Sequence, residues 1–281
     1  MDFVKKHIVE PGTTVRLKKI ATEPDGPFDD KQDAYDFTAD TIAKMRDLQY
    51  RLYVEGKQSL LIVLQAPDAA GKDGVIRKVF GHLNAQGVRT FPFKVPTEIE
   101  RSHDFLWRIH QCTPAAGQVS IFNRSHYEDV LVVRVEDLVP KRVWSKRYEM
   151  INQFELLLAE NGTRIVKFYL HISPAEQLER FKERLDRPEK HWKLNLGDYD
   201  ARQQWDAYRE AYETAFEKCS TKAAPWFVIP ADKKWYRNAA VSAIVCQTLE
   251  EMDPQFPEVD VDLDQVRKRY EDALAQLDDD A

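Results

Sequence analysis

The sequence has few cysteines and no long apolar run. Its three cysteines, Cys112, Cys219 and Cys246, are widely spaced and odd in number, which argues against a disulfide framework or a zinc site and favours reduced thiols. No stretch approaches the roughly 20 apolar residues that a membrane span needs. Residues 1–7 contain no apolar signal core. We therefore expect a cytoplasmic protein without a membrane partner.

Positive charge is not in excess either. Lys and Arg number 41 against 47 Asp and Glu, which gives a formal net charge of −6. We expect no nucleic-acid partner for such a chain, and any polyanionic ligand needs a local basic patch. With 43% hydrophobic and 31% charged residues, the 281-residue chain has the composition of a globular protein.

Two kinds of apolar segment alternate along the chain. Short β-rich runs predict strands, and longer stretches with apolar residues at helical spacing predict helices between them. The predicted strands cover 59–65, 88–95, 119–122, 164–172 and 226–229. The predicted helices cover 31–55, 72–83, 104–110, 142–160, a segment from 174, 201–218 and 235–251. Strands separated by helices imply parallel pairing, so we expect an α/β fold with a mostly parallel five-stranded sheet and helices on both faces.

The chain has no internal repeat and no low-complexity linker. We therefore expect a single domain over 1–281. Residues 1–57 are predicted to form an N-terminal extension and helix. Residues 252–281 are predicted to form a C-terminal tail, with a solvated helix and a frayed end at Asp278–Asp280.

The segment Gln65–Gly74 has the order of a phosphate-binding loop: a buried strand, small residues, Gly-Lys, then a helical pattern. Backbone N–H groups and the positive end of a helix hold phosphate oxygens in such loops, and Lys72 adds a point charge. Asp73 replaces the Ser or Thr that usually holds magnesium, so Asp68 is the nearest oxygen ligand for a metal. The alternative is a chance Gly-Lys pair after a buried strand.

A second polar segment follows the third predicted strand, and so lies at the same edge of a parallel sheet. Asn123 ends that strand, Arg124 offers a planar fork suited to phosphate, and Glu128 supplies a carboxylate. His126 is interpreted as a hydrogen-bonded structural histidine, because no second histidine lies at ligand spacing. Arg134, in an apolar context, needs a phosphate or a carboxylate as its partner. The alternative for the whole segment is a helix cap with a solvated first turn.

The helix predicted after Ser173 carries a basic face. Arg180, Arg184, Arg187 and His191 share this face at helical spacing. We expect a lid over about 180–200 that closes arginines over phosphates and excludes water. The alternative is a solvated helix with ion pairs between neighbouring turns.

Four motifs together resemble the polyphosphate kinase 2 family. They are Gln65–Gly74, His103–Arg108, Phe122–Val130 and the lid stretch from Glu179 to Lys193. The resemblance runs from about Phe28 to Leu249. It implies a phosphate-loop kinase fold with reversible transfer of phosphoryl groups between inorganic polyphosphate and nucleotides. It also implies Mg²⁺ as the cofactor, with Mn²⁺ as a substitute.

The expected roles combine this resemblance with the charges of the residues. Asn123 and Glu128 resemble the branch that accepts both AMP and ADP, so the expected nucleotides are AMP, ADP and ATP, with guanine nucleotides as further candidates. We expect a homo-oligomer. The predicted catalytic residues are Asp68, Lys72, Arg124 and Glu128, with Asp68 and Glu128 as metal ligands. The predicted nucleotide- and phosphate-binding residues are Ala69, Ala70, Gly71, Asp73, Gly74, Asn123 and Arg134. The predicted polyphosphate-binding residues are Arg77, Lys78, Arg180, Arg184, Lys190 and Lys193.

The expected mechanism depends on charge. A phosphate oxygen of AMP or ADP is already ionised at neutral pH, so cations matter more than a strong general base. Two rival interpretations share the same loop. One is an ATP-dependent nucleoside monophosphate kinase, which differs in its donor. The other is a non-catalytic regulatory module, which binds nucleotide without transferring phosphate.

Overall fold

The computed structural model describes residues 2–279, built around a six-stranded sheet in the order β1-β6-β5-β2-β4-β3. Five strands are parallel, and β1 pairs antiparallel with β6 at the sheet edge. The prediction of five strands was wrong because β1, with two residues, is too short for a periodic signal. The strands are β1 Ile8–Val9, β2 Ser59–Gln65, β3 Val88–Pro92, β4 Val119–Asn123, β5 Thr163–His171 and β6 Trp226–Pro230.

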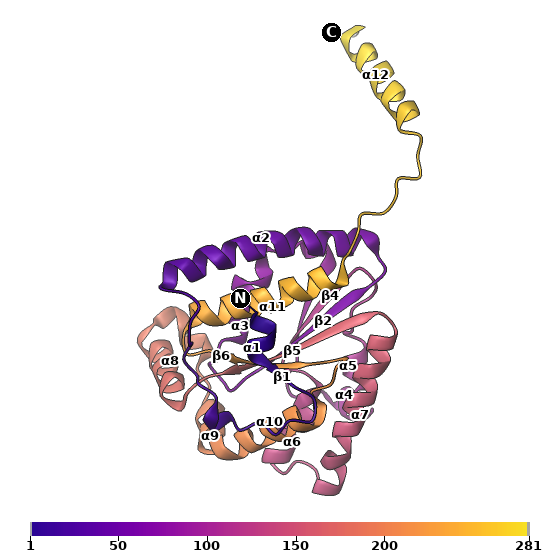
Figure 1. Cartoon of the computed structure of the whole chain (residues 1–281). Helices are drawn as coiled ribbons and strands as arrows, with labels where there is room; N and C mark the ends of the chain where they lie inside the picture. The colour runs from indigo at the N-terminus through magenta and orange to yellow at the C-terminus, as the bar shows by residue number, and fades with distance from the viewer. Residues whose placement is uncertain (1, 280–281) are drawn as a thin grey trace.

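Helices cover both faces of this sheet, as predicted (Figure 1). Side chains alternate along β2, so Leu60 and Ile62 enter one core with α2 (Lys31–Glu55) and α11 (Lys234–Met252). Leu61 and Val63 enter the other, with α7 (Lys141–Glu160) and α10 (Trp205–Cys219). The fully buried β2 is therefore apolar at nearly every position, as expected for a strand covered on two sides.

Most predicted helices are present, and several are shorter than predicted. The helix expected over 72–83 ends at Lys78. Gly81 lies in the turn that would follow, and glycine lowers the helical propensity of that turn. The segment 201–218 is divided at Gln204 into two helices. The shorter helices are α1 Phe3–His7, α3 Lys72–Lys78, α4 Glu98–Arg101, α5 Trp107–His110, α6 Val132–Val135, α8 Pro174–Asp186 and α9 Gly197–Gln203. The 3₁₀ turns are η1 Leu17–Lys19, η2 Phe80–His82, η3 Ala85–Gly87, η4 His126–Asp129 and η5 Pro188–Lys193.

The start of α8 is as predicted, but its end is not. Ser173 caps the helix by accepting a hydrogen bond from the Glu176 amide, with proline at the first helical position. The helix ends at Asp186, and Arg187 has an extended backbone. The prediction that Arg187 and His191 continue the basic helical face was therefore wrong.

The C-terminal helix α12 (Leu263–Asp279) stands away from the rest of the molecule (Figure 1). Part of the predicted frayed end, Asp280, lies outside the described residues.

Across residues 2–279, the structure contains no helix that combines the length and apolarity needed to cross a membrane. The three cysteines are free, as predicted.

Candidate active site

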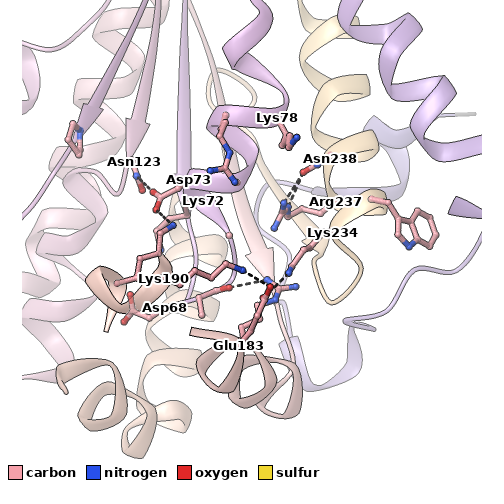
Figure 2. A pocket seen from close by; sticks show the side chains of 18 of the residues that line it. Asp68, Lys72, Asp73, Lys78, Asn123, Glu183, Lys190, Lys234, Arg237 and Asn238 are labelled. Carbon is pink, nitrogen blue, oxygen red and sulfur yellow. Dashed lines mark hydrogen bonds and ion pairs between the residues drawn. The ribbon is translucent and has the colours of Figure 1, made fainter. Parts of the chain in front are cut away.

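A pocket of about 960 Å³ opens at the carboxyl ends of β2 and β4. Among the described residues that line it, eleven are Lys or Arg and three are Asp or Glu. Figure 2 shows several of these side chains converging from the loop after β2 and from α8, η5 and α11. An acidic chain thus contains the local basic patch that a polyanion needs. The predicted site residues in its lining are Asp68, Ala69, Gly71, Lys72, Asp73, Gly74, Arg77, Lys78, Asn123, Arg124, Arg180, Arg184, Lys190 and Lys193.

The loop between β2 and α3 has a backbone that few side chains permit. Gly71 lies at the N-cap of α3 with φ 105°, and Ala69 has φ 62°. A Cβ added to Gly71 would collide with the guanidinium of Arg237. The Val75 amide donates to the Gly71 carbonyl at 3.0 Å. The amides of residues 72–74 therefore lie in the first turn of α3, where intrahelical acceptors are lacking.

The side chain of Arg180 contacts the backbone carbonyls of this loop. Its guanidinium donates to the carbonyls of Ala69 at 3.0 Å and Ala70 at 2.7 Å. It also donates to the carbonyls of Ala231 at 2.6 Å and Asp232 at 3.2 Å, while Nε contacts Glu176 at 2.8 Å.

The five N–H groups of Arg180 are accounted for by these bonds, and the residue is 6% exposed. Arg180 lines the pocket, but its donors are bonded to protein acceptors, so its assignment to polyphosphate stays a prediction. Its guanidinium fixes the carbonyl side of the loop.

Arg237 is a second buried arginine that contacts the loop carbonyls. It was not predicted from the sequence as a site residue. It is 3% exposed, and Nη1 donates to the Ala70 carbonyl at 3.1 Å. Burial, followed by the nearby charge of Arg180, lowers the pKa of Arg237 to about 9. The signal that could have found it is a lone arginine within the otherwise apolar pattern of α11.

Lys72 lies at the start of α3 with its ammonium turned to the loop. Nζ donates to the Ala66 carbonyl at 3.0 Å. Burial and the charge of Arg124 lower the pKa of Lys72 to about 8, against the opposing effect of Asp68 and two other carboxylates. A bound phosphate would add negative charge at the same place and favour the charged ammonium.

Arg124 joins two of the predicted catalytic carboxylates. It has φ 62° and donates to Asp68 at 2.6 Å and to Glu128 at 3.3 Å. Glu128, followed by Asp68, raises the pKa of the Arg124 guanidinium against the effect of burial. All three also line a second cavity, of about 70 Å³, on the side of Tyr212. The predicted quartet of Asp68, Lys72, Arg124 and Glu128 is thus brought together.

A divalent metal fits this cluster. Glu128 Oε1 is buried without a hydrogen-bond partner among the described residues. No group of three or more His, Cys, Asp or Glu within residues 2–279 forms a closed metal site. Mg²⁺ is usually held by one or two carboxylates together with water and substrate phosphates. Asp68 and Glu128 are therefore the residues that would hold it.

Cations of the predicted lid are paired with carboxylates around the pocket. Lys193 lies 3.6 Å from Asp73, which also accepts a hydrogen bond from Asn123 at 2.8 Å. Arg184 contacts Asp198 at 2.8 Å.

Glu183 contacts Lys190 at 2.5 Å and Lys234 at 3.3 Å, as the dashed lines in Figure 2 show. The hydrogen bond from Lys190 is the main cause that lowers the pKa of Glu183 to about 2. These ion pairs connect η5 to α3 and α8, and they connect α9 to α8. The pair of Lys234 with Glu183 connects α11 to α8.

Arg134 and His126 lie outside the pocket. Arg134 donates to the Thr214 hydroxyl at 2.9 Å and lies 5.1 Å from the Trp144 ring centroid. The prediction of a phosphate or carboxylate partner for Arg134 therefore does not fit this structure. His126 is fully buried, with Nε2 3.1 Å from Glu155, which confirms its structural interpretation.

Three comparisons place these features among known proteins. The family described as "Polyphosphate kinase 2 (PPK2)" matches residues 29–257. The "AMP/ADP-polyphosphate phosphotransferase" of Meiothermus ruber is 52% identical over 256 residues, covering 91% of this chain and 96% of that protein. The "ADP-polyphosphate phosphotransferase" of Rhodopseudomonas palustris is 41% identical over 266 residues, covering 90% and 92%. The crystal structure of polyphosphate kinase 2 from Arthrobacter aurescens TC1 has a TM-score of 0.90 and 43% identity, covering 93% and 94%.

Proposed function

The chain belongs to the polyphosphate kinase 2 family, and on that premise we propose that it transfers phosphoryl groups between inorganic polyphosphate and adenine nucleotides. It would convert AMP to ADP and ADP to ATP, reversibly, with guanine nucleotides as further acceptors. The observation that carries the proposal is the basic pocket around the phosphate loop of a chain whose net charge is −6. We place the protein in the cytoplasm on its three free cysteines.

The chemistry of this transfer requires two polyanions to meet. The attacking phosphate oxygen is already ionised, so the site has to overcome repulsion rather than remove a proton. Lys72 and Arg124 line the pocket together with cations of η5 and α3, and they would offset the charge that develops on the transferring group. A pocket of about 960 Å³ has room for a nucleotide and several further phosphates.

Positioning complements this charge. Arg180 and Arg237 donate hydrogen bonds to the carbonyls of the loop. These bonds would hold the loop amides in place, so that they can bind the transferring phosphoryl group with little loss of conformational entropy. Asp68 and Glu128 would hold Mg²⁺, or Mn²⁺ in its place, and the metal would supply further neutralising charge. Arg124 contacts both carboxylates and so holds them next to each other.

The test is a transfer assay with the full chain, Mg²⁺, long-chain polyphosphate and AMP, with ADP and ATP followed by chromatography. We expect both products, and their loss in Lys72→Met excludes a contaminating kinase. Transfer from ATP but not from polyphosphate would indicate a nucleoside monophosphate kinase. Nucleotide binding without any transfer would indicate a regulatory module.

A further inference from the structure

Gln177 is a buried polar side chain that joins the phosphate loop to α9. It lies on α8 and is 2% exposed. Its Nε2 donates to the Asp68 carbonyl at 2.9 Å, and its Oε1 accepts a hydrogen bond from Arg202 of α9 at 2.9 Å. A carbonyl can only accept and a guanidinium can only donate, so the two partners determine which end of the amide faces each of them. A bridge between these two groups needs a donor and an acceptor on one side chain, which an amide supplies.

The bond to Asp68 reaches the part of the loop with an unfavourable backbone. Ala69 has φ 62°, a left-handed conformation that alanine rarely adopts. The Asp68 carbonyl belongs to the peptide group before Ala69, and the Ala69 carbonyl, which accepts from Arg180 at 3.0 Å, belongs to the peptide group after it. Two side chains of α8 therefore hold both peptide groups around Ala69, as a strained conformation requires.

The position of the Asp68 carboxylate depends on the same bond. The Cα atom of Asp68 lies in the plane of the peptide group that Gln177 contacts. Rotation of that peptide group would therefore move the point from which the carboxylate extends. The carboxylate itself lies 2.6 Å from Arg124, so its two ends are fixed by different residues.

The other bond of Gln177 is part of the docking of α9 on α8. The side-chain contacts between these helices join Asp198 to Arg184, Tyr199 to Phe181 and Arg202 to Gln177. Arg202 also donates to the Pro174 carbonyl at 2.8 Å, at the start of α8. Among these contacts, that of Gln177 continues to the phosphate loop.

We propose that Gln177 is a positioning residue for Asp68, and that Arg202 acts on Asp68 through Gln177. The inference rests on the proposed function, in which Asp68 would hold the metal. Hydrogen bonds that orient the ligands of a metal are part of what sets its affinity. The metal site is thereby coupled to η5 and its cations, because α9 follows η5 in the same segment.

The metal dependence of transfer by the full chain tests this role. Gln177→Met keeps the length of the side chain and removes both hydrogen bonds. We expect the Mg²⁺ concentration for the half-maximal rate to rise about tenfold. The KM for polyphosphate at saturating Mg²⁺ should change little. A merely structural role would lower the melting temperature and leave the Mg²⁺ dependence unchanged, and that result would overturn the proposal.

A second substitution tests whether Arg202 acts through Gln177. Arg202→Met leaves the donor to the Asp68 carbonyl in place, so it should raise the Mg²⁺ requirement by a smaller factor. Added to Gln177→Met it should have no further effect, and two factors that multiply would overturn the link between α9 and Asp68.

Tyr199→Leu is the matched control, because it weakens the docking of α9 at a contact that does not include Gln177. It should change the Mg²⁺ requirement little. An increase as large as that of Gln177→Met would indicate general loosening of α9 and overturn the positioning role.

Metal binding without turnover separates this inference from the proposed function. Free Mn²⁺ can be followed by electron paramagnetic resonance in a titration of the protein with bound ADP, with ADP alone as the blank. Gln177→Met should weaken Mn²⁺ binding about tenfold, whether or not transfer occurs. Absence of polyphosphate-dependent transfer in the unmodified protein would overturn the proposed function alone. Unchanged Mn²⁺ affinity in Gln177→Met, or in Arg202→Met if the first variant does not fold, would overturn the inference.

Discussion

The phosphate loop and the segment 187–204 face each other across the pocket, but they are held in different ways. Buried guanidinium groups of Arg180 and Arg237 donate to the loop carbonyls. The segment 187–204 is held by ion pairs, which include the partly exposed pair of Lys193 with Asp73 and the more buried pair of Asp198 with Arg184 of α8. Breaking a buried charged contact costs several kcal/mol, whereas an exposed ion pair contributes about 0–1 kcal/mol.

This difference teaches which part of the site is fixed and which part can move. The loop is held by contacts within the protein, from the side chains of Arg180 and Arg237 to the carbonyls of Ala69 and Ala70. The cations of the segment 187–204 now bind carboxylates, which carry the same kind of charged oxygen as phosphate. We expect incoming polyphosphate to replace Asp73 as the partner of Lys193, so that the segment closes over the donor.

The largest effect is expected from the fixed part. Lys72→Met should lower kcat by about 100- to 1,000-fold, because it removes a cation that stabilises the transferring phosphoryl group. The melting temperature should not fall, since burial already disfavours the charged form of Lys72. Steady-state kinetics and thermal unfolding measured on the same preparation check both points. A loss below about fivefold in a folded variant would contradict the assigned role.

The comparison between the two regions is tested most directly by two arginines one turn apart on α8. Arg180→Gln should lower the free energy of unfolding by about 3 kcal/mol, because it leaves buried carbonyls without donors. Arg184→Gln, the matched control, should cost less, about 1–2 kcal/mol, because it removes one largely buried ion pair rather than four bonds to loop carbonyls, and it should also raise the KM for polyphosphate. Denaturant unfolding and kinetics separate them. Equal destabilisation by both variants would mean that the two regions are held alike.

The pH dependence should reflect Lys72. Its pKa is lowered to about 8 in the free protein, and its protonated form binds phosphate, so kcat/KM for polyphosphate should fall about tenfold from pH 7 to pH 9. The same lowered pKa makes the unfolded state bind the extra proton between pH 8 and 10.5, so the contribution of Lys72 to stability increases over that range. A pH profile with a parallel melting curve therefore distinguishes titration from unfolding. Lys72→Met should lack this fall.

The smallest effect on kinetics is expected from a substitution in the segment 187–204. Lys193→Gln should raise the KM for polyphosphate several-fold and flatten its dependence on salt, because one fewer phosphate contact releases fewer counterions. The KM for the nucleotide should change little, since the loop is untouched. Measuring both constants over a salt series, with the exposed Lys222→Gln as control, checks this. A nucleotide KM that rises as much as that of polyphosphate would show that the two regions do not act separately.

Local sequence was sufficient where the site is built from one segment. The strand before the loop, the small residues and the Gly-Lys pair are contiguous, so β2, α3 and Lys72 could be placed from their order alone. The approach of Arg124 to this loop followed from the rule that parallel strands end at one edge. The capping Ser173 and Pro174 are adjacent to the helix in sequence, so the start of α8 could also be predicted from local sequence.

Contacts between distant segments could not be predicted in this way. Arg180 was assigned to the pocket by its helical spacing, but the carbonyls that receive its hydrogen bonds come from two other loops. Arg134 similarly finds Thr214 on a helix 80 positions away. No pattern in the sequence states where backbone carbonyls lack partners, so the distinction between an arginine that binds substrate and one that supports the loop requires coordinates.

The pairing of β1 with β6 has a consequence for how the chain is completed during synthesis. Ile8 pairs with Phe227, and His7 lies 3.0 Å from the Tyr236 hydroxyl. Within residues 2–279, β1 is the first strand in chain order and β6 the last, so β1 cannot join the sheet until β6 has been made. A chain that stops before Trp226 exposes both the edge of β5 and an unpaired β1, which invites association with other chains. The pairing thus couples burial of β1 to synthesis of the last strand that the structure describes.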